Sequence, residues 1–116
     1  MTNSRILAAA LASALALGGC ATVRGGPSGG ELVGHTLQME TRNGQVSRLT
    51  FNENGTVRAA FGNNSVTGRW DVEDRHLCFF WSGAPRECWP YRSRFERGRT
   101  RTLTSDRGNE VRVTLL

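Results

Sequence analysis

The stretch that decides the fold is residues 68–81, which read GRWDVEDRHLCFFW. On both sides of Asp74 and Arg75, apolar and polar residues alternate, the pattern of half-buried β-strands. A two-residue turn at Asp74 and Arg75 would bring the apolar residues of both runs to one face of a hairpin. The pairs that this register makes are Val72 with Leu77, Trp70 with Phe79 and Gly68 with Trp81.

The same plan continues on both sides of this hairpin. Short alternating runs are separated by Gly and Asn turns at intervals of about ten residues, which is the signature of an antiparallel meander. A two-residue turn is predicted at Asn63 and Asn64, and tight turns at 42–44, 52–55 and 106–108. These turns pair Leu37 with Leu49, Phe51 with Val57, Phe61 with Val66, Val57 with Trp70, and Leu103 with Val111.

All four hairpins from 36 to 81 agree on one apolar face, and consistency of this kind indicates a foldable pattern. The predicted face consists of Leu37, Met39, Leu49, Phe51, Val57, Ala59, Phe61, Val66, Trp70, Val72, Leu77, Phe79 and Trp81. Further strands are expected at 87–92, 99–104 and Glu110–Leu115. The prediction is an all-β, up-and-down meander of about eight short antiparallel strands. It forms a small closed barrel, or alternatively a half-open one, because a one-sided apolar sheet must close or be covered.

A hairpin centred near Gly83 sets Cys78 directly opposite Cys88 on the outer face. Directly opposed residues at a non-hydrogen-bonded site of an antiparallel pair have the β-carbon spacing of a disulfide. This bond is therefore predicted, with two free thiols as the alternative. Zinc held by His76 and the two cysteines is a further reading. The sequence lacks the closely spaced pairs of ligands that are typical of zinc sites, so no metal is predicted.

Five aromatic residues are expected to converge inside: Trp70, Phe79, Trp81, Trp89 and Tyr91. They fill the core or line a ligand cup. Small eight-stranded barrels are barely wide enough for their own side chains, which favours the core.

All 15 basic residues of the chain are Arg, and six of them fall close together. These six are Arg86, Arg92, Arg94, Arg97, Arg99 and Arg101. One interpretation is an anion-binding patch, since guanidinium groups bind phosphates and carboxylates bidentately. The alternative is a solvated face whose charge is balanced by nearby Glu residues. No nucleophile, base or phosphate-loop constellation stands out. We therefore predict no enzyme activity and no cofactor. No nucleic-acid partner is expected either, because the amino terminus indicates an envelope location.

The amino terminus has the parts of an export signal. Arg5 precedes the apolar run ILAAALASALAL at 6–17, which is too short to span a membrane. The following Leu17-Gly18-Gly19-Cys20 resembles the lipobox of bacterial lipoproteins. The resemblance implies a signal peptide at 1–19 and acylation of Cys20, with an ordinary cleaved signal as the alternative. Ala21 favours the periplasmic face of the outer membrane by the same resemblance. With Cys20 acylated, the other two of the three cysteines make a pair.

After Cys20 the sequence becomes rich in glycine. Residues 21–34 read ATVRGGPSGGELVG. We therefore predict that 20–34 is a flexible tether that begins with the lipidated Cys20, and that 35–116 is the β-domain. The Gly68-Arg69-Trp70 and Cys88-Trp89 segments look like small secreted β-proteins of Gram-negative bacteria that carry no assigned activity. The overall plan is similar to the membrane-bound lysozyme inhibitor lipoproteins, but their inhibitory Lys has no counterpart here.

These observations predict a non-catalytic, lipid-anchored binding module of the cell envelope. Its expected partners are the membrane, through the anchor, and an envelope polyanion or periplasmic protein. A carrier of small apolar ligands and an inhibitor of a cell-wall hydrolase are the alternatives, and the oligomeric state is left open.

Overall fold

The computed structural model describes residues 26–116, so the predicted signal peptide, the lipobox and Cys20 lie outside the described residues. All of its regular structure is β. The eight strands are β1 (Thr36–Thr41), β2 (Val46–Phe51), β3 (Thr56–Phe61), β4 (Asn64–Glu73), β5 (His76–Phe80), β6 (Glu87–Pro90), β7 (Thr100–Thr104) and β8 (Glu110–Leu115). Within residues 26–116, no helix is long and apolar enough to cross a membrane.

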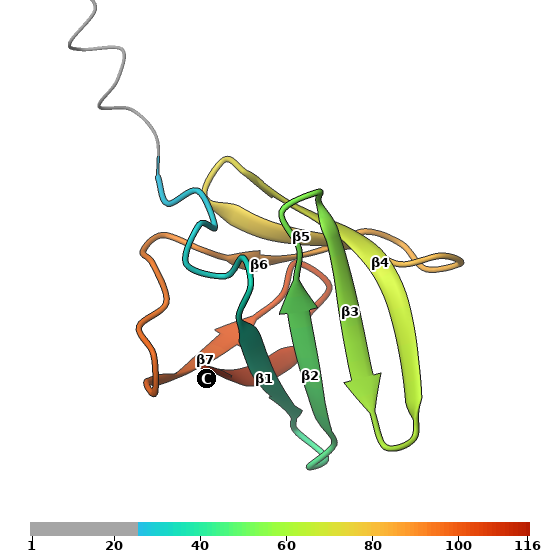
Figure 1. The fold of residues 1–116 in the computed structure, drawn as a ribbon. Helices are drawn as coiled ribbons and strands as arrows, with labels where there is room; N and C mark the ends of the chain where they lie inside the picture. Colours follow the sequence, from blue (N-terminus) through green and yellow to red (C-terminus); the bar gives the residue numbers. More distant parts are fainter. Residues whose placement is uncertain (1–25) are drawn as a thin grey trace, which may run out of the picture.

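The strands form one antiparallel sheet that curls into a nearly closed barrel (Figure 1). Their order is β6-β5-β4-β3-β2-β1-β8-β7. Consecutive strands pair with each other except β6 and β7, and β8 returns to pair with β1. The remaining edges, β6 and β7, face each other across a seam that no strand ladder bridges. The predicted all-β meander and its eight strands are confirmed.

Most of the predicted registers are confirmed as well. Leu37 pairs with Leu49 and Phe51 with Val57. In the β4–β5 hairpin, Asp74 and Arg75 take φ angles of 49° and 61°. Both values belong to the left-handed region that a tight hairpin turn requires. The pairs made there are Val72 with Leu77 and Trp70 with Phe79, and Leu103 pairs with Val111 further along.

The predicted register between β3 and β4 is wrong by two residues. Phe61 pairs with Asn64 and Val57 with Gly68, so the turn consists of Gly62 and Asn63. Gly62 has a φ of 58°, which glycine adopts without a steric penalty. Because a shift of two residues preserves the alternation of faces, the apolar face is unchanged. The strand predicted at 87–92 is also too long: β6 ends at Pro90, which has no N–H to continue a ladder.

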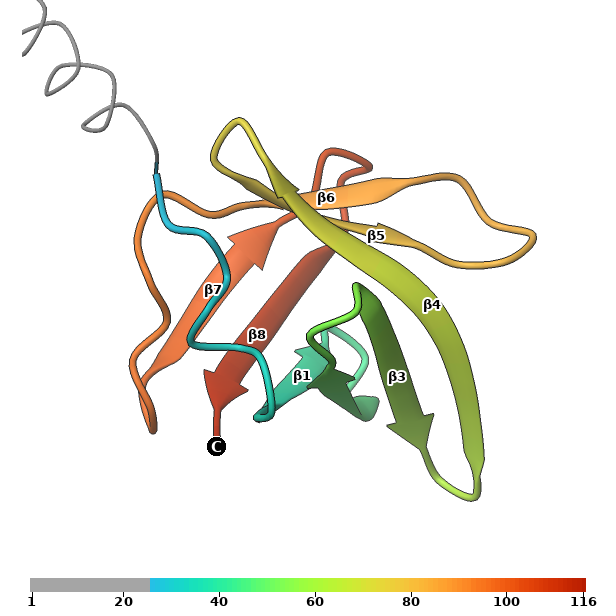
Figure 2. The ribbon, with the colours of Figure 1, turned by 45° about the horizontal axis from the view of Figure 1, so that its top comes forward.

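The meander gives the barrel two different ends. The mouth is the end where the β1–β2, β3–β4, β5–β6 and β7–β8 turns meet. The other end, which we call the closed end, carries the chain before β1, the β2–β3 and β4–β5 turns and the loop 91–99. In Figures 1 and 2 the segment before β1 (blue) runs beside this loop (orange).

The tether predicted to extend to Gly34 ends earlier. Leu32 is completely buried in the barrel core, and Val33 makes a bridge to Phe51 at the end of β2. The backbone N–H of Gly34 donates to the Phe51 carbonyl over 2.9 Å. Residues 29–34 therefore plug the closed end. They were missed because Leu32 and Val33 are an isolated apolar pair among glycines, too short to show strand periodicity.

Candidate functional site

The mouth of the barrel opens into a cavity of about 720 Å³. This lies within the range of roughly 300–1,000 Å³ that is usual for small-molecule sites. Its apolar wall consists of Met39, Leu49, Ala59, Phe61, Val66, Phe79, Trp81, Trp89 and Val111. The side chains therefore leave open space at the mouth. We call this cavity the cup.

Three of the five predicted aromatic residues line the cup, and Phe79 is at their centre. The ring centroids of Phe79 and Trp89 lie 4.7 Å apart in an edge-on arrangement. Trp81 lies parallel to Phe79 at 6.0 Å. Phe79 and Trp89 are buried, whereas Trp81 is half-buried and presents part of its ring to the cup. These rings thus form both the floor of the cup and the top of the core.

Gly68 makes the position of Trp81 possible. A β-carbon at residue 68 would lie 2.5 Å from the Cε3 atom of Trp81, closer than any real contact allows. The missing side chain lets the indole lie flat against β4. The predicted pairing of Gly68 with Trp81 therefore holds as a contact, although β5 ends at Phe80 before the ladder reaches it.

The rim of the cup is polar. Arg42, Asn43 and Gln45 line it from the β1–β2 turn, and Glu87 and Asn109 line it from the seam side. The Asn109 amide donates to the Glu87 carboxylate over 2.8 Å, which ties the β7–β8 turn to the start of β6. An apolar interior below a polar rim suits a ligand that buries its apolar part and leaves a polar end near solvent.

The other two aromatic residues, Trp70 and Tyr91, lie elsewhere. Trp70 is half-buried and packs edge-on against Phe51, with ring centroids 5.2 Å apart. Tyr91 is completely buried and stacks at 5.3 Å on Phe95. Because β6 ends at Pro90, Tyr91 belongs to the closed end and takes no part in the cup.

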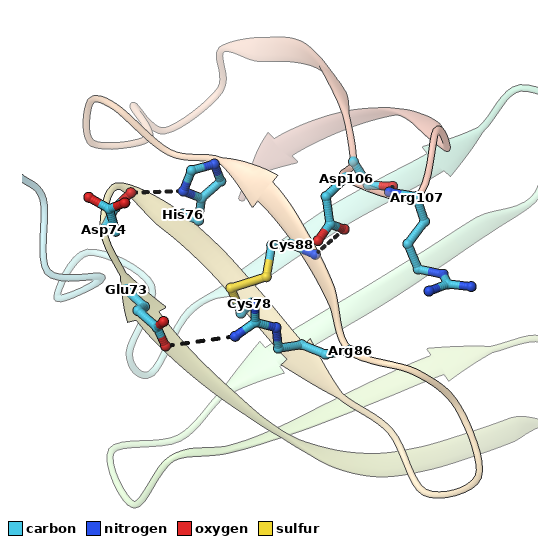
Figure 3. The surroundings of a disulfide bond; sticks show 9 residues. Glu73, Asp74, His76, Cys78, Arg86, Cys88, Asp106 and Arg107 are labelled. Atoms are coloured by element: carbon cyan, nitrogen blue, oxygen red, sulfur yellow. Dashed lines mark hydrogen bonds and ion pairs between the residues drawn. A yellow bond between two sulfur atoms is a disulfide. The ribbon is translucent and has the colours of Figure 1, made fainter.

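Cys78 and Cys88 pair directly across β5 and β6 and form the predicted disulfide (Figure 3). Both residues are buried, at 2% and 4% exposure. The zinc reading loses its ligands, because both sulfur atoms are in the disulfide. Among residues 26–116, no group of three His, Cys, Asp or Glu side chains is placed to hold a metal ion.

Asp106 bridges the seam beside this disulfide. The Cys88 N–H donates to the Asp106 carboxylate over 2.9 Å, and the Asp106 N–H donates to the Cys88 carbonyl over 2.9 Å. These two bonds join β6 to the turn after β7, where no ladder exists. The role of Asp106 was not predicted, because the turn sequence indicates local geometry only.

The closed end is organised by Glu31, whose side chain is only 7% exposed. One carboxylate oxygen accepts hydrogen bonds from the Tyr91 hydroxyl and from the Phe95 N–H. The other has no hydrogen-bond partner among the described residues and lies 3.7 Å from the Nε atom of Arg94. Burial and the hydrogen bond to Glu31 raise the pKa of the Tyr91 hydroxyl well above its ordinary value.

The structure divides the six predicted arginines. Arg86 lies beside Glu73 near the disulfide (Figure 3) and is separated from the others by β6. Arg101 packs over the Phe95 ring at 4.6 Å and donates to the Ser93 carbonyl, so it supports the loop from within. The remaining four are exposed on the loop: Arg92, Arg94, Arg97 and Arg99. The patch is therefore smaller than predicted and confined to the closed end.

Two residues that matter for this end, Glu31 and Phe95, were missed. Neither lies in an alternating run: Glu31 follows two glycines, and Phe95 stands between Arg94 and Glu96. No family model, curated protein or solved structure matches the chain.

Proposed function

We propose that this protein is a non-catalytic, lipid-anchored module of the cell envelope that holds a small apolar ligand in the cup. The observation that carries the proposal is the 720 Å³ cavity, with its aromatic floor and polar rim. The lipobox resemblance supports the anchor and the envelope location. The disulfide also suits an oxidising compartment outside the cytoplasm.

The chemistry of the wall limits the ligand. Aliphatic and aromatic side chains surround the cup, and they offer contact area and ring faces but few hydrogen bonds. A ring system or a short hydrocarbon chain with one polar end matches this arrangement. The carrier reading, which the sequence placed second, is therefore the one that the geometry favours.

Two adjacent alanines offer a matched test. Ala59 is buried at the wall of the cup, whereas Ala60 follows it on the same strand and is exposed on the outer face. Ala59→Phe would place a ring in the cup, and Ala60→Phe would place the same ring in solvent. The probe is N-phenyl-1-naphthylamine, an uncharged apolar fluorophore whose emission rises when it leaves water.

We expect the wild-type protein and Ala60→Phe to take up the probe with energy transfer from the cup tryptophans. Ala59→Phe should lose at least about tenfold in affinity, since a filled cavity offers no apolar surface to bury. Trp81→Ala, which enlarges the cup, serves as a second variant should Ala59→Phe not fold. Equal affinity of Ala59→Phe and Ala60→Phe, with both folded, would show that the cup is not the site.

A further inference from the structure

The closed end combines two features that meet nowhere else on the barrel. The described chain begins there, at Gly26 beside the Arg75 side chain, and runs past loop 91–99, whose Arg92, Arg94, Arg97 and Arg99 are exposed. Glu31 joins the two segments directly, through Tyr91 and the Phe95 N–H. In both ribbon views, the chain before β1 and this loop lie side by side (Figures 1 and 2).

The loop carries more positive charge than its own acids balance. Residues 91–99 contain four Arg and a single Glu. Arg99 pairs with Glu96 at 2.8 Å, and Arg94 leans on Glu31 at 3.7 Å. Arg92 and Arg97 are exposed and make no ion pair with another described residue. Their guanidinium groups are therefore available to an external anion.

We propose that the closed end docks on an anionic phospholipid surface, with Arg92 and Arg97 against the lipid phosphates and the mouth turned away from the membrane. This inference rests on the proposed acylation of Cys20. Cys20 precedes Gly26 by six residues, a contour length of roughly 20 Å. An acyl anchor would thus hold this end of the barrel, rather than the mouth, within a short distance of the headgroups.

Electrostatics sets how the barrel sits on the membrane. Basic residues are attracted to an anionic leaflet only within about a Debye length of roughly 8–10 Å. Of the other two turns at the closed end, 52–55 carries Glu53 and 74–75 carries Asp74 beside Arg75. Neither turn has a net positive charge, so the attraction is strongest on the side of loop 91–99. The barrel therefore leans on this loop. A mouth that points away exchanges its ligand with the aqueous compartment or a partner protein, and not with the membrane of the anchor.

The test uses the full chain, produced in a Gram-negative host and reconstituted in nanodiscs of phosphatidylcholine with or without phosphatidylglycerol. A headgroup-linked gadolinium lipid broadens the amide signals nearest the bilayer. With phosphatidylglycerol, we expect broadening at residues 92–98 and no broadening at residues 42–45 or 105–109. Arg92→Glu with Arg97→Glu should remove most of this broadening. Arg48→Glu with Arg107→Glu makes the same charge change away from the closed end and should leave it intact.

Broadening at the mouth, or the same response from both double variants, would overturn the orientation. The mass of the reconstituted protein shows independently whether Cys20 is acylated. If it is not, co-sedimentation of the unacylated chain with the same lipids as vesicles tests the docking surface alone. Binding that ignores phosphatidylglycerol and both charge reversals would then contradict it. Failure of the cup to bind its probe would affect the proposed function and leave this orientation standing.

Discussion

At the scale of single residues, one buried carboxylate determines how the chain enters the barrel. Glu31 lies in a segment whose sequence indicates only a flexible tether, yet it accepts hydrogen bonds from Tyr91 and from the Phe95 N–H. These two donors satisfy one oxygen of the buried carboxylate, and the other oxygen lies 3.7 Å from the Nε atom of Arg94. Sequence patterns indicate which residues share a periodic face. They cannot indicate a single residue such as Glu31, whose partners lie 60 and 64 positions away in the chain.

Tyr91 gives this arrangement a pH signature. The folded-state pKa of its hydroxyl is raised by burial first and by the Glu31 hydrogen bond second. The stability that neutral Tyr91 contributes is therefore fully present below the unfolded pKa of about 10 and is lost as pH rises through the folded value. We expect the free energy of unfolding to fall above about pH 10 in the wild type and to fall less in Tyr91→Phe.

The chain suits this measurement, because it has one Tyr and no Lys. The ultraviolet absorbance of tyrosinate therefore reports Tyr91 alone. It should stay absent at the ordinary pKa of tyrosine and rise only as the protein unfolds. A tyrosinate signal that grows with the ordinary pKa while the circular dichroism remains native would contradict the buried hydrogen bond.

At the scale of elements, the seam between β6 and β7 is the weak line of the barrel. Seven strand pairs form ladders, whereas the seam is held by the hydrogen bonds of Asp106 to Cys88 and of Asn109 to Glu87. Removing the side-chain acceptor in Asp106→Ala leaves the Cys88 N–H without its partner. This should cost about 1–3 kcal/mol of stability in denaturant unfolding, together with faster hydrogen exchange at the Cys88 amide.

Asp106→Asn is the matched control, since its side-chain carbonyl can still accept from the same N–H. It should keep most of both the stability and the amide protection. If Asp106→Ala and Asp106→Asn behave alike, the carboxylate oxygen does not hold the seam. This contact was beyond sequence reasoning, because β6 and the β7–β8 turn meet only through closure of the barrel. Most of the hairpin pairings, including Cys78 with Cys88, depend on local turns and were predicted for that reason, whereas the β3–β4 register was not.

At the scale of the whole molecule, the barrel is filled at one end and hollow at the other. Residues 29–34 and loop 91–99 close one end, and the cup occupies the other. Alternation and turn chemistry were sufficient for the fold class, since they determine which residues face inward. They do not determine the volume enclosed. The extra β4 length and the Gly62 turn carry Phe61 and Val66 out to the mouth, where they line the cavity without filling it.

The most direct test of the cup is the native mass of the full chain, extracted from the envelope in mild detergent without reductant. We predict a mass that exceeds the acylated, disulfide-bonded chain by one small apolar molecule. This adduct should be absent from Ala59→Phe and present in Ala60→Phe. A wild-type protein that carries nothing, or an adduct that Ala59→Phe retains, would contradict the account.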